Sequence, residues 1–193
     1  MSSPVSNEPK VRELNPRQAG TMDRLVQATL DELRAVGFED LTVRTVAARA
    51  AVAPATAYTY FASKNHLVAE AFWGRLAARP GPEVLTGEPV DRVVAVFRDL
   101  AGFLSGEPAL AAAATTAMLG PEPDVKRLRR LIAEEIQRRL TEAYGGTPDA
   151  ARLEVLGLAW AGAMLQAGMG HATYEQMGDQ LARVSHAVMG GAR

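Results

Sequence analysis

The chain has 193 residues, of which 48% are hydrophobic, and its formal net charge at pH 7 is −1. It contains no cysteine, which excludes disulfide bonds and any metal site or nucleophile built on a thiolate. The near-neutral charge argues against a general nucleic-acid coat protein, so any contact with DNA has to come from a few well-placed cations.

The N-terminal third is predicted to consist of a disordered arm followed by four helices. The arm, residues 1–18, is polar and contains three prolines. Thr42 and Ser63 are placed to cap helices. Gly37 is placed to end a helix, and Pro54 suits the first position of another. The four predicted helices cover residues 21–37, 43–50, 54–61 and 64–79.

The remainder of the chain begins with a breaker-rich linker, "PGPEVLTGEP", at residues 80–89. Alanine dominates the composition and the alternation of apolar and polar residues typical of strands is scarce, which indicates an all-α protein. Helices are predicted over residues 89–106, 108–119, 124–144, 148–171 and 173–189. A larger C-terminal helical domain, residues 80–193, is therefore expected after the linker.

The two short helices before residue 62 are separated by only a few small residues, and a supporting helix precedes them. This arrangement is typical of a helix-turn-helix, in which the second helix lies in the major groove. Thr56 to Tyr60 crowd hydroxyl groups onto that second helix, where short donors on a rigid scaffold can reach phosphate oxygens. We therefore expect a DNA-binding domain at residues 19–65, continued by a connecting helix at residues 66–79.

The segment "GFEDLTVRTVAARAAVAPATAYTYFASKNHL", residues 37–67, resembles the TetR family of one-component transcriptional repressors. It shares the family's Gly-aromatic start, the Thr-Val pair, the turn, Thr-x-Tyr-x-x-Phe, and the Lys before Leu. The resemblance covers about a third of the chain, and it implies an N-terminal DNA-binding domain with a C-terminal domain for ligand binding and dimerisation. Double-stranded DNA with a palindromic operator, a small-molecule effector and a second copy of the chain are the partners that it implies.

The resemblance also assigns roles to particular side chains. It implies that Thr42 and Lys64 contact DNA phosphates and that Tyr58 and Tyr60 contact the DNA backbone. It places Arg44, Ala55 and Thr56 at base edges. The candidate DNA-binding residues are Thr42, Arg44, Ala55, Thr56, Tyr58, Tyr60 and Lys64. Tyr58 and Tyr60 could instead be half-buried core residues, and Arg44 a solvated one. Two positions depart from the family pattern, because Ala51 replaces the usual turn glycine and Ala53 the usual serine cap.

The C-terminal half contains aromatic and methionine side chains that suit an irregular hydrophobic ligand. The candidate ligand-binding residues are Phe97, Phe103, Met118, Trp160 and Met164, and plain core packing is the alternative for each. The helix at residues 89–106 has Arg98 as its only mid-helix cation. We therefore expect an apolar or amphiphilic effector, such as a lipid-derived or acyl compound.

The dimer surface is expected on the last two predicted helices. The first carries small residues at intervals of four, among them Ala163 and Ala167, and the second carries an apolar stripe that includes Met177 and Leu181. The alternative is that both rows face their own domain.

No cofactor or metal is expected, because His66, His171 and His186 are far apart in sequence and have no close partner. A helical enzyme is the competing class, but no nucleophile with a base and no carboxylate pair is visible. A helical adaptor that does not bind DNA is a third class, which the helix-turn-helix motif disfavours. The first ten residues lack the apolar run of a signal peptide, and no stretch is long and apolar enough to span a membrane. A cytoplasmic protein without a membrane partner is therefore expected.

Overall fold

The computed structural model describes residues 15–82 and 86–190, and every regular element within these ranges is an α-helix. This confirms the all-α prediction. The elements are α1 (Pro16–Asp40), α2 (Val43–Arg49), α3 (Pro54–Tyr60), α4 (Lys64–Ala77), α5 (Pro89–Gly106), α6 (Pro108–Ala117), α7 (Pro123–Tyr144), α8 (Ala150–Gly168) and α9 (Tyr174–Met189). None of these helices combines the length and the apolarity needed to cross a bilayer.

The first helix begins earlier than the sequence predicted. The Asn15 side chain accepts a hydrogen bond from the Gln18 amide, and the Gln18 side chain accepts one from the Asn15 amide, both at 3.0 Å. This capping box, with Pro16 at the first position, starts α1 before Thr21. The prediction of a disordered arm over residues 1–18 is therefore wrong for residues 15–18, while residues 1–14 lie outside the described ranges.

The predicted helix stop at Gly37 appears as a break inside α1. Gly37 has φ 77° and ψ 179°, and the element continues beyond it to Asp40. A backbone with this positive φ suits glycine, which has no Cβ to clash with the neighbouring carbonyl. The break turns the chain toward the two short helices that follow.

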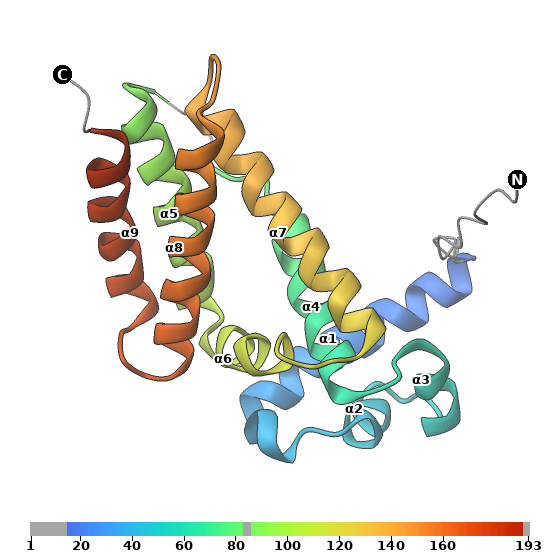
Figure 1. Ribbon diagram of the computed structural model, residues 1–193. Helices are drawn as coiled ribbons and strands as arrows, with labels where there is room; N and C mark the ends of the chain where they lie inside the picture. Colours follow the sequence, from blue (N-terminus) through green and yellow to red (C-terminus); the bar gives the residue numbers. More distant parts are fainter. Residues whose placement is uncertain (1–14, 83–85, 191–193) are drawn as a thin grey trace, which may run out of the picture.

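The helices pack around one continuous hydrophobic core that runs from α1 to α9. Figure 1 shows α5, α8 and α9 side by side, and α9 contacts both of the others. Helix α4 contacts α1 as well as α6 and α7, so it joins the first three helices to the rest of the molecule. Together with a direct contact between α1 and α6, helix α4 therefore links the N-terminal helices to the C-terminal ones.

A buried arginine fixes the far end of α4. Arg139 of α7 is only 4% exposed, and its guanidinium donates hydrogen bonds to the carbonyls of Leu76 and Arg79, at 2.9 Å each. It also donates to Glu135 Oε1 at 2.6 Å. These bonds give a side-chain donor to two carbonyls at and just beyond the end of α4, where the regular helical hydrogen bonds stop. The C-terminus of α4 is thus tied to α7.

Candidate DNA interface

Helices α2 and α3 form a compact helix-turn-helix unit that packs on α1 through α2. Thr42 and Thr45 form a capping box that starts α2, with each side-chain oxygen accepting from the other residue's amide at 3.1 Å. Ala57 in the middle of α3 is fully buried, and Phe61 at its end is 1% exposed. Phe61 thus anchors the end of this helix in the core. Because one side of α3 is held in this way, its opposite side is free to meet another molecule.

The turn between α2 and α3 carries a strained residue. Ala51 has φ 52°, a left-handed conformation that costs a residue with a Cβ about 1–2 kcal/mol. The chain thus accepts backbone strain at the position where the family pattern has a glycine. Ala53 forms no side-chain cap, and Pro54 begins α3 without one, as the sequence indicated.

The three residues predicted to meet base edges all lie on the exposed surface. These are Arg44 on α2, and Ala55 and Thr56 on α3. Within the described residues no carboxylate pairs with Arg44, whereas the neighbouring Arg49 binds Glu32 at 2.6 Å. The Arg44 guanidinium is therefore available to an external acceptor, and the Arg49 guanidinium is engaged inside the protein.

The two tyrosines of α3 differ in their surroundings. Tyr58 is 48% exposed, which rules out the alternative that it is a core residue. Tyr60 is half-buried, and its ring centroid lies 6.4 Å from that of Phe61. Tyr58 can thus extend into solvent, whereas Tyr60 leans on the core and exposes only part of its surface.

Lys64 has a role within the fold that the sequence did not indicate. Its ammonium donates hydrogen bonds to the carbonyls of Phe38 at 3.1 Å and Glu39 at 3.2 Å. It also lies 4.4 Å from the centroid of the Phe38 ring, a cation–π distance. Lys64 therefore joins the start of α4 to the end of α1. The phosphate contact implied by the family resemblance stays a prediction.

A hollow beside α3 contains two arginines that are not among the candidate DNA-binding residues. Its lining includes Arg17, Thr21 and Arg24 from the start of α1, and Tyr60 from the end of α3. No carboxylate lines it. The signal that could have identified these residues is the capping box at Asn15, because it extends α1 far enough to bring Arg17 onto ordered structure.

The aromatic residues predicted to bind a ligand belong to the closed core. Phe97 of α5 and Trp160 of α8 are buried and stack with their ring centroids 6.3 Å apart. Phe103 is buried against Phe72 of α4, at a centroid distance of 5.7 Å. Met118 and Met164 are half-buried and pack against the same core. The structure thus brings Phe97 and Trp160 together and places Phe103 nearer to α4.

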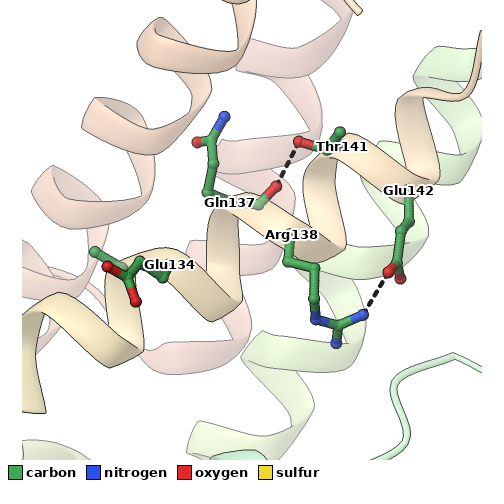
Figure 2. Close-up of a pocket in the computed structure, with 6 residues that line it drawn as sticks. Glu134, Gln137, Arg138, Thr141 and Glu142 are labelled. Atoms are coloured by element: carbon green, nitrogen blue, oxygen red, sulfur yellow. Dashed lines mark hydrogen bonds and ion pairs between the residues drawn. The ribbon is translucent and has the colours of Figure 1, made fainter.

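A separate open hollow lies along α7. Figure 2 shows its lining residues, which come from one helix and, apart from Ala133, are of polar or charged types. Arg138 is bound there to Glu142 at 2.6 Å, and Thr141 donates to the carbonyl of Gln137 at 2.8 Å. None of the predicted ligand-binding residues lines it. The hollow is open and is lined by a single helix, so it does not form the enclosed site expected for an apolar effector.

The last two helices expose a different surface from the one expected. Ala163 and Ala167 of α8 are each 8% exposed, and Met177 and Leu181 of α9 are almost fully buried within their own chain. The alternative that these rows face their own domain therefore holds for all four. The large exposed apolar side chains there are instead Val155, Leu158 and Leu165 of α8 and Met169, its C-cap. They recur at intervals that place them along one side of the helix, and we call them the α8 stripe.

The geometry of the N-terminal helices defines a class of protein. A capped α2, a tight turn and a short α3 anchored on one side present an arginine and several hydroxyl groups to solvent. Hydroxyl and guanidinium donors on such a face suit phosphate oxygens and base edges. The fold and this face are those of a helix-turn-helix DNA-binding protein.

Comparisons with known proteins identify the family. Residues 25–71 match the family described as "Bacterial regulatory proteins, tetR family". The HTH-type transcriptional regulator Rv0767c of Mycobacterium tuberculosis is 42% identical over 181 residues, which cover 92% of this chain and 84% of that protein. The chain belongs to the TetR family of transcriptional regulators, and it is a regulator and not an enzyme.

Solved structures show the same fold. A TetR transcriptional regulator from Rhodococcus sp. RHA1 matches with a TM-score of 0.73 and 19% identity, over 92% of this chain and 100% of that one. FadR of Thermus thermophilus, a TetR-family transcriptional repressor solved in complex with lauroyl-CoA, matches with a TM-score of 0.61 and 17% identity. That match covers 87% of this chain and 94% of FadR.

Proposed function

We propose that this regulator is a repressor that binds a palindromic operator as a homodimer and is released by an apolar or amphiphilic small molecule. The observation that carries the DNA-binding part is the exposed face of α2 and α3, where Arg44, Thr56 and Tyr58 lie without a covering element. A mobility-shift assay with DNA from the promoter of its own gene tests this part. Retarded promoter DNA at concentrations that leave an unrelated duplex unshifted is the expected result. Equal binding to both duplexes would contradict it.

The effector class follows from the aromatic packing of the C-terminal helices. Phe97 and Trp160 form an apolar contact between α5 and α8, and Phe103 extends this apolar region to Phe72 on α4. A long acyl chain could replace these contacts with others of the same chemistry, because burial of apolar surface is non-directional. The complex of Thermus thermophilus FadR with lauroyl-CoA supports fatty acyl thioesters as the first compounds to test.

Release from DNA requires the effector to bind one conformation better than another. Helix α4 contacts α1 on the DNA-binding side and α6 and α7 on the other. An acyl chain that entered between α5 and α8 would displace core side chains and shift the helices packed on α4. The proposed consequence is a change in the separation of the two DNA-binding units of a dimer, which no longer fits the two half-sites.

Met164 provides the test of the effector site. Met164→Trp adds bulk to a half-buried position on α8 and should prevent an acyl-CoA from releasing promoter DNA while DNA binding itself persists. The assay is release of labelled promoter DNA during titration with acyl-CoA thioesters of increasing chain length. Thr116→Trp, at an exposed position on α6, is the control and should respond like the wild type. Unchanged release in Met164→Trp would remove this residue from the site.

The α8 stripe supports the homodimer. Leu158 is 67% exposed and Met169 is 55% exposed, which leaves large apolar side chains in water in an isolated chain. Contiguous exposed apolar side chains of this kind mark protein–protein interfaces. Because a two-fold symmetric contact pairs the same surface on both copies, α8 would pack near α8 of the second copy. Each dimer would then present two copies of α3 to the two halves of a palindrome.

A further inference from the structure

The loop between α6 and α7 is hydrogen-bonded to the start of α4. Glu122 lies in this loop, and its Oε1 accepts hydrogen bonds from Ser63 Oγ at 3.1 Å and from Asn65 Nδ2 at 3.0 Å. Figure 1 shows this loop passing the end of α4 that lies nearest to α2 and α3. Ser63 and Asn65 flank the first residue of α4 and closely follow Phe61, the C-cap of α3. A carboxylate from the C-terminal half of the chain thus holds the segment that directly follows the candidate recognition helix.

The contact with Ser63 controls a helix cap. Ser63 is the N-cap of α4, and its Oγ accepts a hydrogen bond from the His66 amide at 3.1 Å. A serine hydroxyl has a single proton, which here points to Glu122 and leaves a lone pair for the amide of His66. Glu122 therefore orients the hydroxyl that caps α4.

The carboxylate of Glu122 occupies a tightly defined place. Its second oxygen, Oε2, is buried and has no hydrogen-bond partner among the described residues. A Cβ added to Gly120 would lie 2.3 Å from this oxygen and 3.0 Å from Asn65 Nδ2. Since the first distance is shorter than any real contact, a side chain at residue 120 would displace the Glu122 carboxylate from this place. The absence of a Cβ at Gly120 thus leaves room for the carboxylate beside Asn65.

Further polar contacts join α4 to α7 around His66. The side chain of His66 is 10% exposed, and its Nδ1 accepts from the Ala62 amide at 3.3 Å and lies 3.7 Å from Asp124 Oδ2 on α7. Glu70 of α4 binds Arg127 of α7 at 3.4 Å. Burial lowers the pKa of His66, and the charge of Asp124 acts in the opposite direction. These contacts flank Glu122 and keep α4 and α7 in register.

We infer that Glu122 is a positioning residue for DNA binding, which acts through Ser63 and Asn65 to hold the start of α4 and the adjoining end of α3. This inference rests on the DNA-binding function of the family. Glu122 itself is not expected to touch DNA. Its electrostatic effect alone would weaken DNA binding, because phosphates repel a carboxylate. A positioning role therefore predicts that loss of the hydrogen bonds accepted by Glu122 weakens binding, which is the opposite sign.

The test compares two substitutions of Glu122 in the full chain. Glu122→Ala should lower the affinity for promoter DNA by roughly five- to tenfold, in the range of coupling between distinct sites. Its affinity for an unrelated duplex and the dependence of binding on salt should stay the same, because no phosphate contact is lost. Glu122→Gln should retain most of the affinity, since its amide oxygen can accept the same two hydrogen bonds. Promoter binding by Glu122→Ala that equals or exceeds that of the wild type would overturn the inference.

A double-mutant cycle with Asn65→Ala adds an independent test. If Glu122 affects DNA binding through its hydrogen bond with Asn65, the double variant Asn65→Ala, Glu122→Ala should lose little more affinity for promoter DNA than Glu122→Ala alone. Fully additive losses would overturn the inference. Glu175→Ala removes an exposed carboxylate from α9 and should bind promoter DNA as the wild type does. A wild-type protein that does not prefer promoter DNA would instead contradict the proposed function.

Discussion

Arg44 is the residue whose side chain has most freedom to read a base. It is exposed on α2, and no carboxylate among the described residues competes for its guanidinium. Arg44→Ala should weaken operator binding by about 1–3 kcal/mol, the range of one bidentate contact with guanine, and relax the preference at one operator position. Binding to a set of single-base operator variants measures both effects.

The control for Arg44 is an arginine of similar exposure at the other end of the molecule. Arg183 lies exposed on α9, so Arg183→Ala should leave both affinity and base preference unchanged. If Arg44→Ala binds every operator variant as the wild type does, Arg44 does not read bases.

Ala51 stores strain in the turn between α2 and α3. Because its φ is 52°, replacement by glycine should remove a clash of about 1–2 kcal/mol, partly offset by the greater freedom of glycine in the unfolded chain. We expect Ala51→Gly to raise the free energy of unfolding by up to about 1 kcal/mol. Urea unfolding at a fixed protein concentration measures this change.

The neighbouring Ala50 provides a matched control for Ala51. It has a right-handed conformation, with φ −76° and ψ −3°, so Ala50→Gly relieves no strain and should lower the free energy of unfolding by about 1 kcal/mol. Equal changes in the two variants would show that the turn holds no strain at Ala51.

At the level of whole helices, the contact of α7 with the end of α4 depends on Arg139. Arg139→Met keeps an apolar stem of similar length but leaves Glu135 and the carbonyls of Leu76 and Arg79 without this donor. Glu135 keeps its bonds to Arg138, so the cost is that of leaving buried carbonyls without this donor, about 1–3 kcal/mol. We therefore expect a decrease of this size in the free energy of unfolding, measured with urea.

The adjacent Arg138 is the control for Arg139, because it carries the same charge at an exposed position. Its side chain is 51% exposed and binds Glu135 and Glu142 at the surface. Exposed ion pairs of this kind contribute about 0–1 kcal/mol, so Arg138→Met should have a much smaller effect than Arg139→Met. Similar losses in both variants would contradict the role assigned to burial.

At the level of the whole molecule, the α8 stripe is expected to hold two copies together. Leu158→Glu would place a charge in the middle of the proposed interface, where burial without a partner costs several kcal/mol. The variant should remain folded, because Leu158 is exposed in the single chain, but it should run as a monomer and lose operator affinity. Light scattering and mobility shifts measure the two outcomes.

Two further glutamate substitutions serve as controls for Leu158→Glu. Ala112→Glu, at an exposed site on α6, should stay dimeric. Ala163→Glu should unfold the chain, since Ala163 is buried in its own core. A wild-type protein that is monomeric at micromolar concentration would rule out the proposed dimer.

The sequence by itself determined the order and the ends of most helices. Thr42, Ser63 and Pro54 start helices through hydrogen bonds and backbone angles that involve only near neighbours, so their roles can be recognised from residue type and spacing. The helix-turn-helix was predictable for the same reason, because its turn and caps are local. Asn15 is an exception, because its capping box lies next to a proline in a polar segment, and such a composition predicts disorder.

Only the tertiary structure decided what covers each apolar or charged face. Periodicity shows that a helix has an apolar side, but it does not show whether the helix's own core or another molecule buries it. Met177 and Leu181 therefore turned out to be internal, while Leu158 is exposed. Lys64 likewise depends on the carbonyls of Phe38 and Glu39, which the fold brings close to it. Such partners are distant in sequence, and no local pattern predicts which residues the fold will bring into contact.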